Sequence, residues 1–282
     1  MTSFRMALVQ VRPTRNKEEN IASATKLVLE AAANGADLVV LPELFTCVLE
    51  DECFIKNAEF ITGPQPGTTT VALSQLAKDA NIYLVGGSYP EKDPSSKKIY
   101  NTCTVWNNKG EMIAMHRKVH LYDVDIPNKL VAKESNVFAA GNSLTSFDSP
   151  WGKIGVAICY DVRYPEMAMY AARQGCVAMI YPAAFNTVTG PLHWELLLRS
   201  RALDNMIFVA GCGPANTPTD PTPAYGHSMI VGPKGNIIES TGMKESIIMS
   251  EINLAEIDEI RSSIPIYTQR RFDVYSDISS VQ

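Results

Sequence analysis

The chain contains the stretch Lys-Ile-Gly-Val-Ala-Ile-Cys-Tyr-Asp-Val-Arg-Tyr-Pro-Glu, which runs from Lys153 to Glu166. Its first part, up to Ile158, is apolar and rich in β-branched residues, which predicts a buried strand. Pro165 is typical of the first position of a helix. Cys159 therefore lies where a strand ends, at the carboxyl edge of a sheet, and open α/β folds place their sites at that edge. Taken alone, a cysteine here is equally compatible with a small core side chain.

Length and composition favour a single domain. A chain of 282 residues is long enough to bury a sizeable core. No Pro/Gly-rich linker, block of like charge, low-complexity segment or fixed-period repeat divides the sequence. We therefore expect a single domain over residues 1–264, followed by a polar C-terminal tail over residues 265–282.

Charge and cysteine usage restrict the partners and the compartment. The 25 Lys and Arg against 30 Asp and Glu give a net charge of −5 without a basic patch, so nucleic acid is not expected to bind. The first residues lack a signal-peptide pattern, and no apolar run approaches membrane-spanning length. Six dispersed cysteines without a Cys-x-x-Cys pair favour a reducing setting. We expect a cytoplasmic protein without a membrane partner, and a mitochondrial pool is compatible with the same pattern.

Strand-like and helix-like segments alternate along the chain, which predicts an α/β fold with hairpins in its sheets. The expected strands are 4–11, 36–41, 82–86, 100–106, 111–116, 144–147, 153–158, 177–181, 206–211, 227–231, 237–239 and 246–252. The expected helices are 18–34, 69–81, 165–174, 193–205 and 254–264, and the long expected loops are 46–67 and 121–135.

Two more titratable groups follow expected strands. Glu43 lies just past the strand over 36–41 and would share a sheet edge with Cys159. The run His-Arg-Lys-Val-His at 116–120 continues another strand, and in an extended chain Lys118 faces the same way as its two histidines. Each feature alone is compatible with a solvated loop acid or a solvated strand end.

The remaining motifs exclude several chemistries. The four histidines, at 116, 120, 193 and 227, form no helical pair four residues apart and lie near no paired acids, so no metal ion is expected. The sequence has no Gly-rich phosphate loop and no Gly-x-Ser-x-Gly elbow.

Three separated motifs make the chain resemble the nitrilase superfamily, the carbon-nitrogen hydrolases. They are Leu-Pro-Glu at 41–43, His-Arg-Lys-Val-His-Leu at 116–121 and Gly-Val-Ala-Ile-Cys-Tyr-Asp-Val-Arg-Tyr-Pro-Glu at 155–166. Each is modest evidence alone, but their order and spacing together are specific. The chain is most similar to the Nit2/Nit3-type omega-amidases of this superfamily, through the segments 100–102, 121–127 and 269–276.

The resemblance implies both an architecture and a catalytic set. The implied fold is a four-layer α-β-β-α sandwich with two mixed sheets, and the implied assembly is a homodimer with the tail 265–282 at its interface. The catalytic set maps onto Glu43, Lys118 and Cys159, with Glu134 in support and no cofactor. For Glu134, an ordinary loop salt bridge is an equal alternative.

The chemistry of these residues supports the same assignment. A thiol is mostly protonated at neutral pH, so Cys159 needs a cation to favour its thiolate or a base to take its proton, and Lys118 and Glu43 supply both. An oxyanion formed on attack would be stabilised by Lys118 and by the Tyr160 backbone N–H. Glu43 would protonate departing ammonia and later activate water.

Pocket residues are harder to assign from the sequence. Tyr160, beside the nucleophile, and Phe185, Asn186 and Thr187, after a later strand, are the candidates for substrate binding. Arg163 and its neighbour three residues on, a glutamate, are expected to pair with each other at the start of a helix.

The resemblance implies an omega-amidase that hydrolyses the terminal amide of a short dicarboxylic acid monoamide, such as 2-oxoglutaramate or 2-oxosuccinamate, to the dicarboxylate and ammonia. A carbamoylamide hydrolase would use the same residues with another pocket, and a non-catalytic scaffold that kept the fold is the alternative of another class. The acidic group Glu-Asp-Glu at 50–52, within the segment 46–57, departs from the relatives. It is expected to face solvent or to pair with Lys129 or Lys133.

Overall fold

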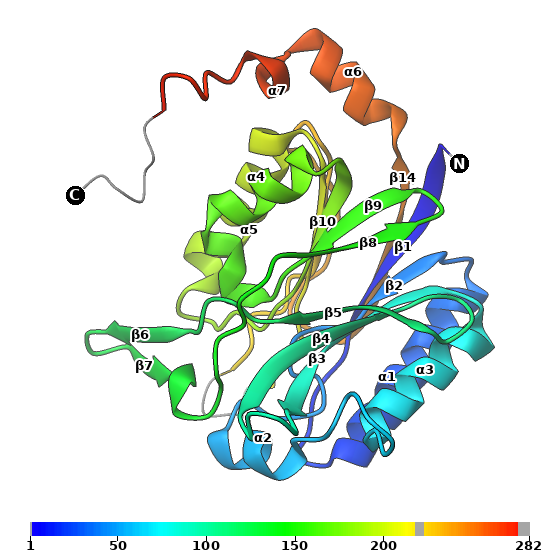
Figure 1. Ribbon diagram of the computed structural model, residues 1–282, viewed down its shortest axis with the longest axis vertical. Helices are drawn as coiled ribbons and strands as arrows, with labels where there is room; N and C mark the ends of the chain where they lie inside the picture. The colour runs from blue at the N-terminus through cyan, green and yellow to red at the C-terminus, as the bar shows by residue number, and fades with distance from the viewer. Residues whose placement is uncertain (1, 218–222, 276–282) are drawn as a thin grey trace.

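Two six-stranded sheets form the centre of the molecule (Figure 1), a computed structural model that describes residues 2–217 and 223–275. In spatial order, the first sheet contains β14 (Ser246–Asn253), β1 (Ser3–Gln10), β2 (Leu38–Val40), β3 (Tyr83–Lys92), β4 (Ile99–Trp106) and β5 (Met112–Arg117). The second contains β13 (Ile237–Ser240), β12 (Met229–Val231), β11 (Phe208–Cys212), β10 (Cys176–Pro182), β9 (Gly152–Val156) and β8 (Thr145–Ser149). Both sheets combine parallel and antiparallel pairs.

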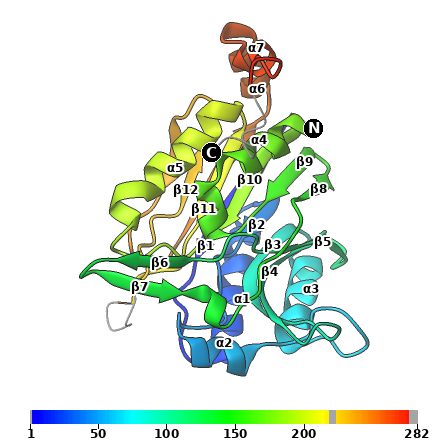
Figure 2. The ribbon, with the colours of Figure 1, turned by 60° about the vertical axis from the view of Figure 1, so that its left-hand side comes forward.

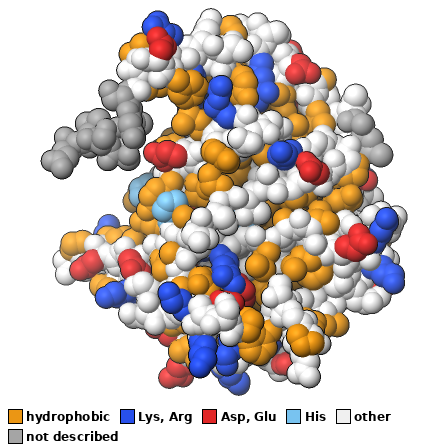
Figure 3. Space-filling model, in the orientation of Figure 1, with side chains coloured by type: hydrophobic (Ala, Val, Ile, Leu, Met, Phe, Trp, Pro, Cys, Tyr) orange, Lys and Arg blue, Asp and Glu red, His pale blue; other side chains and the backbone are white. Residues whose placement is uncertain are grey.

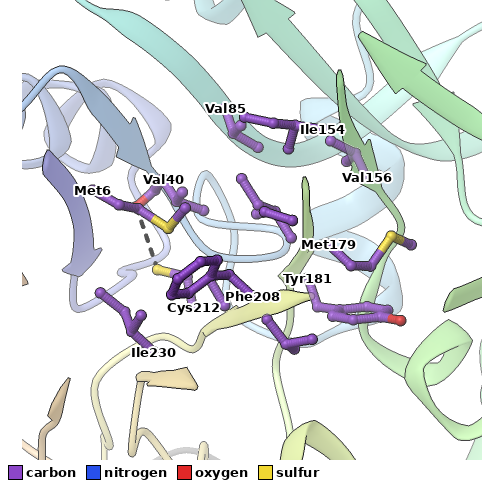
Figure 4. Packing of buried hydrophobic residues seen from close by; sticks show 14 of the residues in the cluster. Met6, Val40, Val85, Ile154, Val156, Met179, Tyr181, Phe208, Cys212 and Ile230 are labelled. Carbon is purple, nitrogen blue, oxygen red and sulfur yellow. Dashed lines mark hydrogen bonds between the residues drawn. The ribbon is translucent and has the colours of Figure 1, made fainter. Parts of the chain in front are cut away.

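Alternation along the strands explains why the sheets pack face to face. Met6 and Leu8 of β1 point into the core between the sheets, whereas Ala7 and Val9 belong to the core under the helices. Successive side chains of a strand face opposite sides, so a strand with apolar residues at every position is buried on both faces. Figure 4 shows this packing, in which the Cys212 thiol of the second sheet donates a hydrogen bond to the Val40 carbonyl oxygen of the first at 3.4 Å.

Helices cover the two outer faces (Figure 2). The first sheet is covered by α1 (Lys17–Ala33) and α3 (Thr68–Ala80), and the second by α4 (Pro165–Arg173) and α5 (Gly190–Asn205). The expected four-layer α-β-β-α sandwich with two mixed sheets is therefore confirmed.

Both segments expected as long loops contain secondary structure, so these two predictions were wrong. The helix α2 (Asp51–Asn57) lies within 46–67. The hairpin of β6 (Asp123–Ile126) and β7 (Leu130–Lys133), followed by the 3-10 turn η1 (Glu134–Asn136), occupies 121–135 and projects from the body in Figure 2. Each element is short, and such short segments show little periodicity in a sequence.

The C-terminal region extends from the end of the sandwich as α6 (Ala255–Ser263) and α7 (Ile266–Gln269). The described part of the expected tail lies partly on its own α4: the Tyr267 hydroxyl donates to the Ala172 carbonyl oxygen at 3.2 Å, and Arg173 lies over the rings of Tyr267 and Phe272. Residues 276–282 of the tail lie outside the described residues. None of the described helices is long and apolar enough to cross a membrane.

Candidate active site

The three catalytic candidates come from both sheets. Glu43 follows β2 and Lys118 follows β5 in the first sheet, whereas Cys159 follows β9 in the second. They are brought together in one pocket because the sheets pack face to face. The expectation that Glu43 and Cys159 share one sheet edge was wrong, although both lie after the carboxyl end of a strand.

Close packing fixes the segment that carries Glu43. Gly87 has a φ of +61°, and a Cβ there would lie 2.3 Å from the Pro42 carbonyl oxygen. Only glycine permits this approach and this left-handed backbone without strain. The glutamate is thereby held at a fixed height above the sheet, with only 3% of its surface exposed.

The nucleophile candidate lies on a strained turn. Cys159 has a φ of +45°, a left-handed conformation that non-glycine residues rarely adopt. The buried Asp161 carboxylate stabilises the turn by accepting hydrogen bonds from the Ile158 N–H at 3.0 Å and the His120 N–H at 2.9 Å. The sequence interpretation assigned no role to Asp161.

The same carboxylate joins the turn to the segment that carries Lys118. His116 Nε2 lies 3.2 Å and His120 Nδ1 lies 2.8 Å from the Asp161 oxygens. Burial by itself raises the pKa of Asp161, but these hydrogen bonds outweigh it and hold the pKa well below its usual range. The two histidines of the basic run thus connect the two sheets, and Lys118 between them is fixed relative to Cys159.

Lys118 lies between two carboxylates. Its Nζ is 2.8 Å from Glu43 Oε1 and 2.8 Å from Glu134 Oε2, and the lysine side chain is only 2% exposed. Glu134 also accepts from the Tyr122 N–H at 2.7 Å. The structure therefore brings Glu134 to the catalytic candidates, as the sequence suggested.

Burial and neighbouring charges set the ionisation of the site. Burial raises the pKa of Glu43, as does the negative charge of Glu134, while Lys118 opposes the rise. Burial and the charge of Glu43 raise the pKa of Cys159 well above its ordinary value. Burial would lower the pKa of Lys118, but the two carboxylates raise it well above its ordinary value. At neutral pH the site therefore holds a protonated thiol and a charged lysine.

Asn101 is a further buried residue of this cluster that sequence analysis missed. Its Nδ2 donates to Glu43 Oε1 at 2.8 Å and to Glu134 Oε1 at 3.1 Å. Its backbone carbonyl accepts from the Lys118 N–H at 2.9 Å. The only signal in the sequence was its place in the segment 100–102 that resembles the omega-amidases.

The site opens into a pocket of about 380 Å³ between the hairpin β6–β7, α2 and the turn after β9. Tyr160, Phe185 and Asn186, three of the candidates for substrate binding, line it. Thr187 is not among the lining residues, and Thr189, two positions later, is. The hairpin contributes lining residues that the predicted loop did not suggest, namely Leu130, Val131, Ala132 and Lys133.

Arg163 faces this pocket instead of pairing with Glu166. Its Nη1 lies 3.2 Å from His193 Nδ1, and its guanidinium lies over the rings of Tyr160 and Phe185. Within residues 2–217 and 223–275, no carboxylate forms an ion pair with it. The prediction of a local pair was wrong because the turn η2 (Cys159–Arg163) directs this side chain inward, while Glu166 is exposed.

The acidic group 50–52 lies at the start of α2. Glu50 pairs with Arg15, and Asp51 and Glu52 are exposed in the first helical turn, where acidic residues are favourable. None of the described ion pairs joins them to Lys129 or Lys133. Asp51 also lines the pocket, so one of the three acids lies at its mouth.

The geometry fits nucleophilic acyl chemistry. A buried thiol, an adjacent carboxylate and a charged lysine are the parts needed to attack a carbonyl carbon and to stabilise the resulting oxyanion. Within the part of the chain that the structure describes, no cluster of His, Cys, Asp and Glu has the arrangement of a metal site.

Comparisons with known proteins agree with the geometry. The family model described as carbon-nitrogen hydrolase matches residues 5–262. The chain is 44% identical to the omega-amidase NIT2 of Homo sapiens, over 98% of each chain. It is 47% identical to the omega-amidase NIT3 of Saccharomyces cerevisiae, over 98% of this chain and 96% of that one.

A solved structure shares the fold. The crystal structure of Saccharomyces cerevisiae Nit3, described as a member of branch 10 of the nitrilase superfamily, superposes with a TM-score of 0.89 at 43% identity. The alignment covers 96% of this chain and 97% of that one. The chain belongs to the carbon-nitrogen hydrolase family, within the nitrilase superfamily.

Proposed function

We propose that the protein is an omega-amidase, a hydrolase that cleaves the terminal amide of a short dicarboxylic acid monoamide to the dicarboxylate and ammonia. The observation that carries the proposal is one pocket that contains Glu43, Lys118 and Cys159 together with the Arg163 guanidinium, which no carboxylate of the described residues pairs with. Two omega-amidases that are 44% and 47% identical to this chain over nearly its full length support the same reaction. Preferred substrates are amides such as 2-oxoglutaramate and 2-oxosuccinamate.

Catalysis begins with a proton transfer, because the thiol is protonated at rest. Glu43 takes the proton from Cys159 Sγ as the sulfur attacks the amide carbon, and the C=O π electrons move to oxygen. Lys118 Nζ and the Tyr160 N–H stabilise the oxyanion. As the intermediate collapses, the C–N bond breaks and Glu43 returns the proton to the nitrogen, which leaves as ammonia.

The second half of the reaction releases the acid. Glu43 takes a proton from water as the water oxygen attacks the thioester carbon, and Lys118 again stabilises the oxyanion. The C–S bond breaks, the sulfur regains a proton from Glu43, and the product departs as a carboxylic acid that loses its proton to solvent. Glu134 keeps Lys118 charged and in place, which its two short contacts with Nζ support.

The far carboxylate of the substrate binds Arg163 in this proposal. Lys118 is already neutralised by two carboxylates, so its charge is not available for a second anion. Among residues 2–217 and 223–275, no carboxylate pairs with Arg163, whose guanidinium presents a planar fork suited to a carboxylate. Tyr160 and Phe185, which lie under the guanidinium, and Asn186 complete the binding site on this side.

A substrate panel tests the assignment. Ammonia release should be fastest with succinamate, glutaramate or their 2-oxo forms, slower with uncharged amides, and absent with carbamoyl amino acids. Arg163→Leu should lower kcat/KM for the anionic amides about 10- to 100-fold, the usual size for a lost charged hydrogen bond, and leave the uncharged amides unaffected. Faster turnover of uncharged amides by the wild type would overturn the omega-amidase assignment, and carbamoyl turnover would favour the carbamoylamide hydrolase.

The pH profile tests the role of Glu43 as base. The base must be ionised, so kcat/KM should fall as the pH falls through the raised pKa of Glu43. Removing the charge of Glu134 removes one cause of that rise. Glu134→Gln should therefore shift the acidic limb of the kcat/KM profile to lower pH, and a shift to higher pH would contradict the assigned electrostatics.

We further propose a single catalytic domain over residues 1–264 and a homodimer that uses α5 and the tail. Leu192, Leu196 and Leu203 of α5 are 65%, 64% and 49% exposed, and apolar side chains are interspersed over the face that carries α4 and α5 (Figure 3). In the tail, Phe272 and Tyr275 are 46% and 54% exposed. The three leucines lie around one surface hollow, and exposed apolar groups of this kind mark interaction surfaces.

Light scattering tests the assembly. Leu196→Glu and deletion of residues 265–282 are each expected to raise the dissociation constant of the dimer, because the first places a charge in the interface and the second removes aromatic contacts. Leu29→Glu, an exposed leucine on α1 at the other side of the sandwich, is the control. A tail deletion that leaves the dimer unchanged would refute the role of the tail.

The reducing cytoplasm is our proposal for the compartment. All six cysteines are buried free thiols, which is the state that a reducing compartment maintains.

A further inference from the structure

The buried cluster behind the pocket contains a second bridge between the two catalytic carboxylates. Lys118 Nζ is one bridge, with 2.8 Å to Glu43 Oε1 and 3.0 Å to Glu134 Oε1. Asn101 Nδ2 is the other and donates to the same two oxygen atoms, at 2.8 Å and 3.1 Å. Asn101 is fully buried on β4 and does not line the pocket, so it can act only through its neighbours.

The two bridges leave the oxygens of Glu43 in different states. Oε1 accepts from both Lys118 and Asn101, which uses its lone pairs. Among the described residues, no nitrogen donor reaches Oε2, and the carboxylate is also a hydrogen-bond partner of the Cys159 thiol, so Oε2 is the oxygen left for that thiol. Without Asn101, Lys118 would be the only nitrogen donor to the Glu43 carboxylate among the described residues, and the carboxylate could rotate about its terminal torsion, which is broad for glutamate.

The amide is kept at an energetic cost. Asn101 Oδ1 is buried and has no hydrogen-bond partner in the described structure. A buried carbonyl oxygen without a hydrogen-bond partner destabilises the folded state. The opposite amide orientation would direct Oδ1 at two carboxylates and is excluded by repulsion. A purely structural asparagine would be better replaced by an apolar side chain, so the cost indicates a task that needs the NH2 group.

We propose that Asn101 is a positioning residue that fixes the rotation of the Glu43 carboxylate, so that Oε2 faces the Cys159 thiol and, later, the attacking water. This inference deepens the proposed function and rests on it. It also gives a reason for the backbone hydrogen bond from the Lys118 N–H to the Asn101 carbonyl oxygen, which fixes Asn101 of β4 relative to Lys118 after β5.

The kinetic signature follows from the geometry. Asn101→Leu keeps the number and branching of the side-chain heavy atoms but cannot donate, so kcat should fall on the order of 10-fold or more while KM changes little, because Asn101 does not touch the substrate. Loss of a donor to the ionised form of Glu43 should also move the acidic limb of the kcat/KM profile to higher pH. Glu134→Gln is expected to move the same limb to lower pH. Substitutions of Asn101 and Glu134, the two neighbours of the Glu43 carboxylate, should therefore shift the acidic limb in opposite directions.

Asn101→Asp sharpens the test. It keeps the shape but places a third carboxylate beside Glu43 and Glu134, so the acidic limb should move further to higher pH than in Asn101→Leu. Asn205→Leu is the matched control, because Asn205 is equally a buried asparagine whose Nδ2 donates a single hydrogen bond, to the Arg201 carbonyl oxygen at 2.9 Å. Asn205→Leu should lower the midpoint temperature of thermal unfolding without shifting the acidic limb of the kcat/KM profile.

A second readout does not require the natural substrate. The rate of Cys159 alkylation by iodoacetamide, followed against pH by intact mass, should be lowered in Asn101→Leu and unchanged in Asn205→Leu. If circular dichroism shows that the Asn101 variants are folded, and both the acidic limb of their kcat/KM profile and their alkylation profile match the wild type, this inference is overturned. The omega-amidase assignment would then remain in place. Turnover by Cys159→Ala would instead overturn the proposed function beneath it.

Discussion

Replacing Cys159 by alanine is expected to abolish ammonia release and leave the sandwich folded. Among the described residues that line the pocket with Glu43 and Lys118, Cys159 is the one cysteine. Removing a nucleophile that acts together with its base removes the whole covalent pathway. The measurement is ammonia release from glutaramate over several hours, with circular dichroism to show that the fold is retained.

The control for this variant is Cys176→Ala. Cys176 is also buried, and burial raises its pKa to about 11, but it lies at the start of β10, outside the residues that line the pocket. Its activity should match the wild type. Wild-type protein quenched during turnover should show an acyl adduct on Cys159 by mass spectrometry. Turnover by Cys159→Ala would refute the mechanism, and an inactive wild type without adduct would favour a non-catalytic scaffold.

Replacing Lys118 is expected to have the second largest effect. Lys118→Met keeps the length of the side chain but removes the ammonium, so kcat should fall on the order of 10²-fold or more, as for other lost oxyanion donors. The change also leaves Glu43 and Glu134 buried without their shared cation, which raises the pKa of Glu43 further and weakens it as an ionised base near neutral pH.

Two controls separate catalysis from stability in this experiment. Lys109→Ala, in the exposed turn between β4 and β5, should leave kcat unchanged. Thermal unfolding should show a lower midpoint for Lys118→Met, since two like charges then remain in a buried cluster. If a folded Lys118→Met variant keeps kcat within threefold of the wild type, Lys118 is not the oxyanion donor.

The positions of the candidate catalytic groups could be predicted because they depend on local patterns. Glu43, Lys118 and Cys159 each follow an apolar or alternating run, and a strand end is visible in a sequence from the side-chain period alone. The layers of the fold were predicted from the resemblance, and the alternation of strands and helices gave only the α/β class. The short elements α2, β6 and β7 escaped prediction because four to seven residues carry too little periodicity.

What escaped prediction at the site depends on contacts between distant residues. Asn101 and Glu43 are 58 positions apart, and Asp161 binds the ring of His116 from 45 positions away. Arg163 had a local glutamate within reach, and only the turn after Cys159 decided that it lines the pocket. Polar side chains in the interior hydrogen-bond to the partners that packing brings near them. These partners are distant in the sequence, so local sequence patterns do not identify them.

The sequence by itself determined which reactive groups stand at the ends of strands, because strand and helix periods are properties of neighbouring residues. Only the tertiary structure decided that these ends meet across two sheets, that Asn101 and Lys118 share the same carboxylate oxygens, and that Arg163 lines the pocket. The physical reason is that the ionisation and orientation of a buried group follow from its desolvation and its charged neighbours, and both are fixed only when the two sheets close over them.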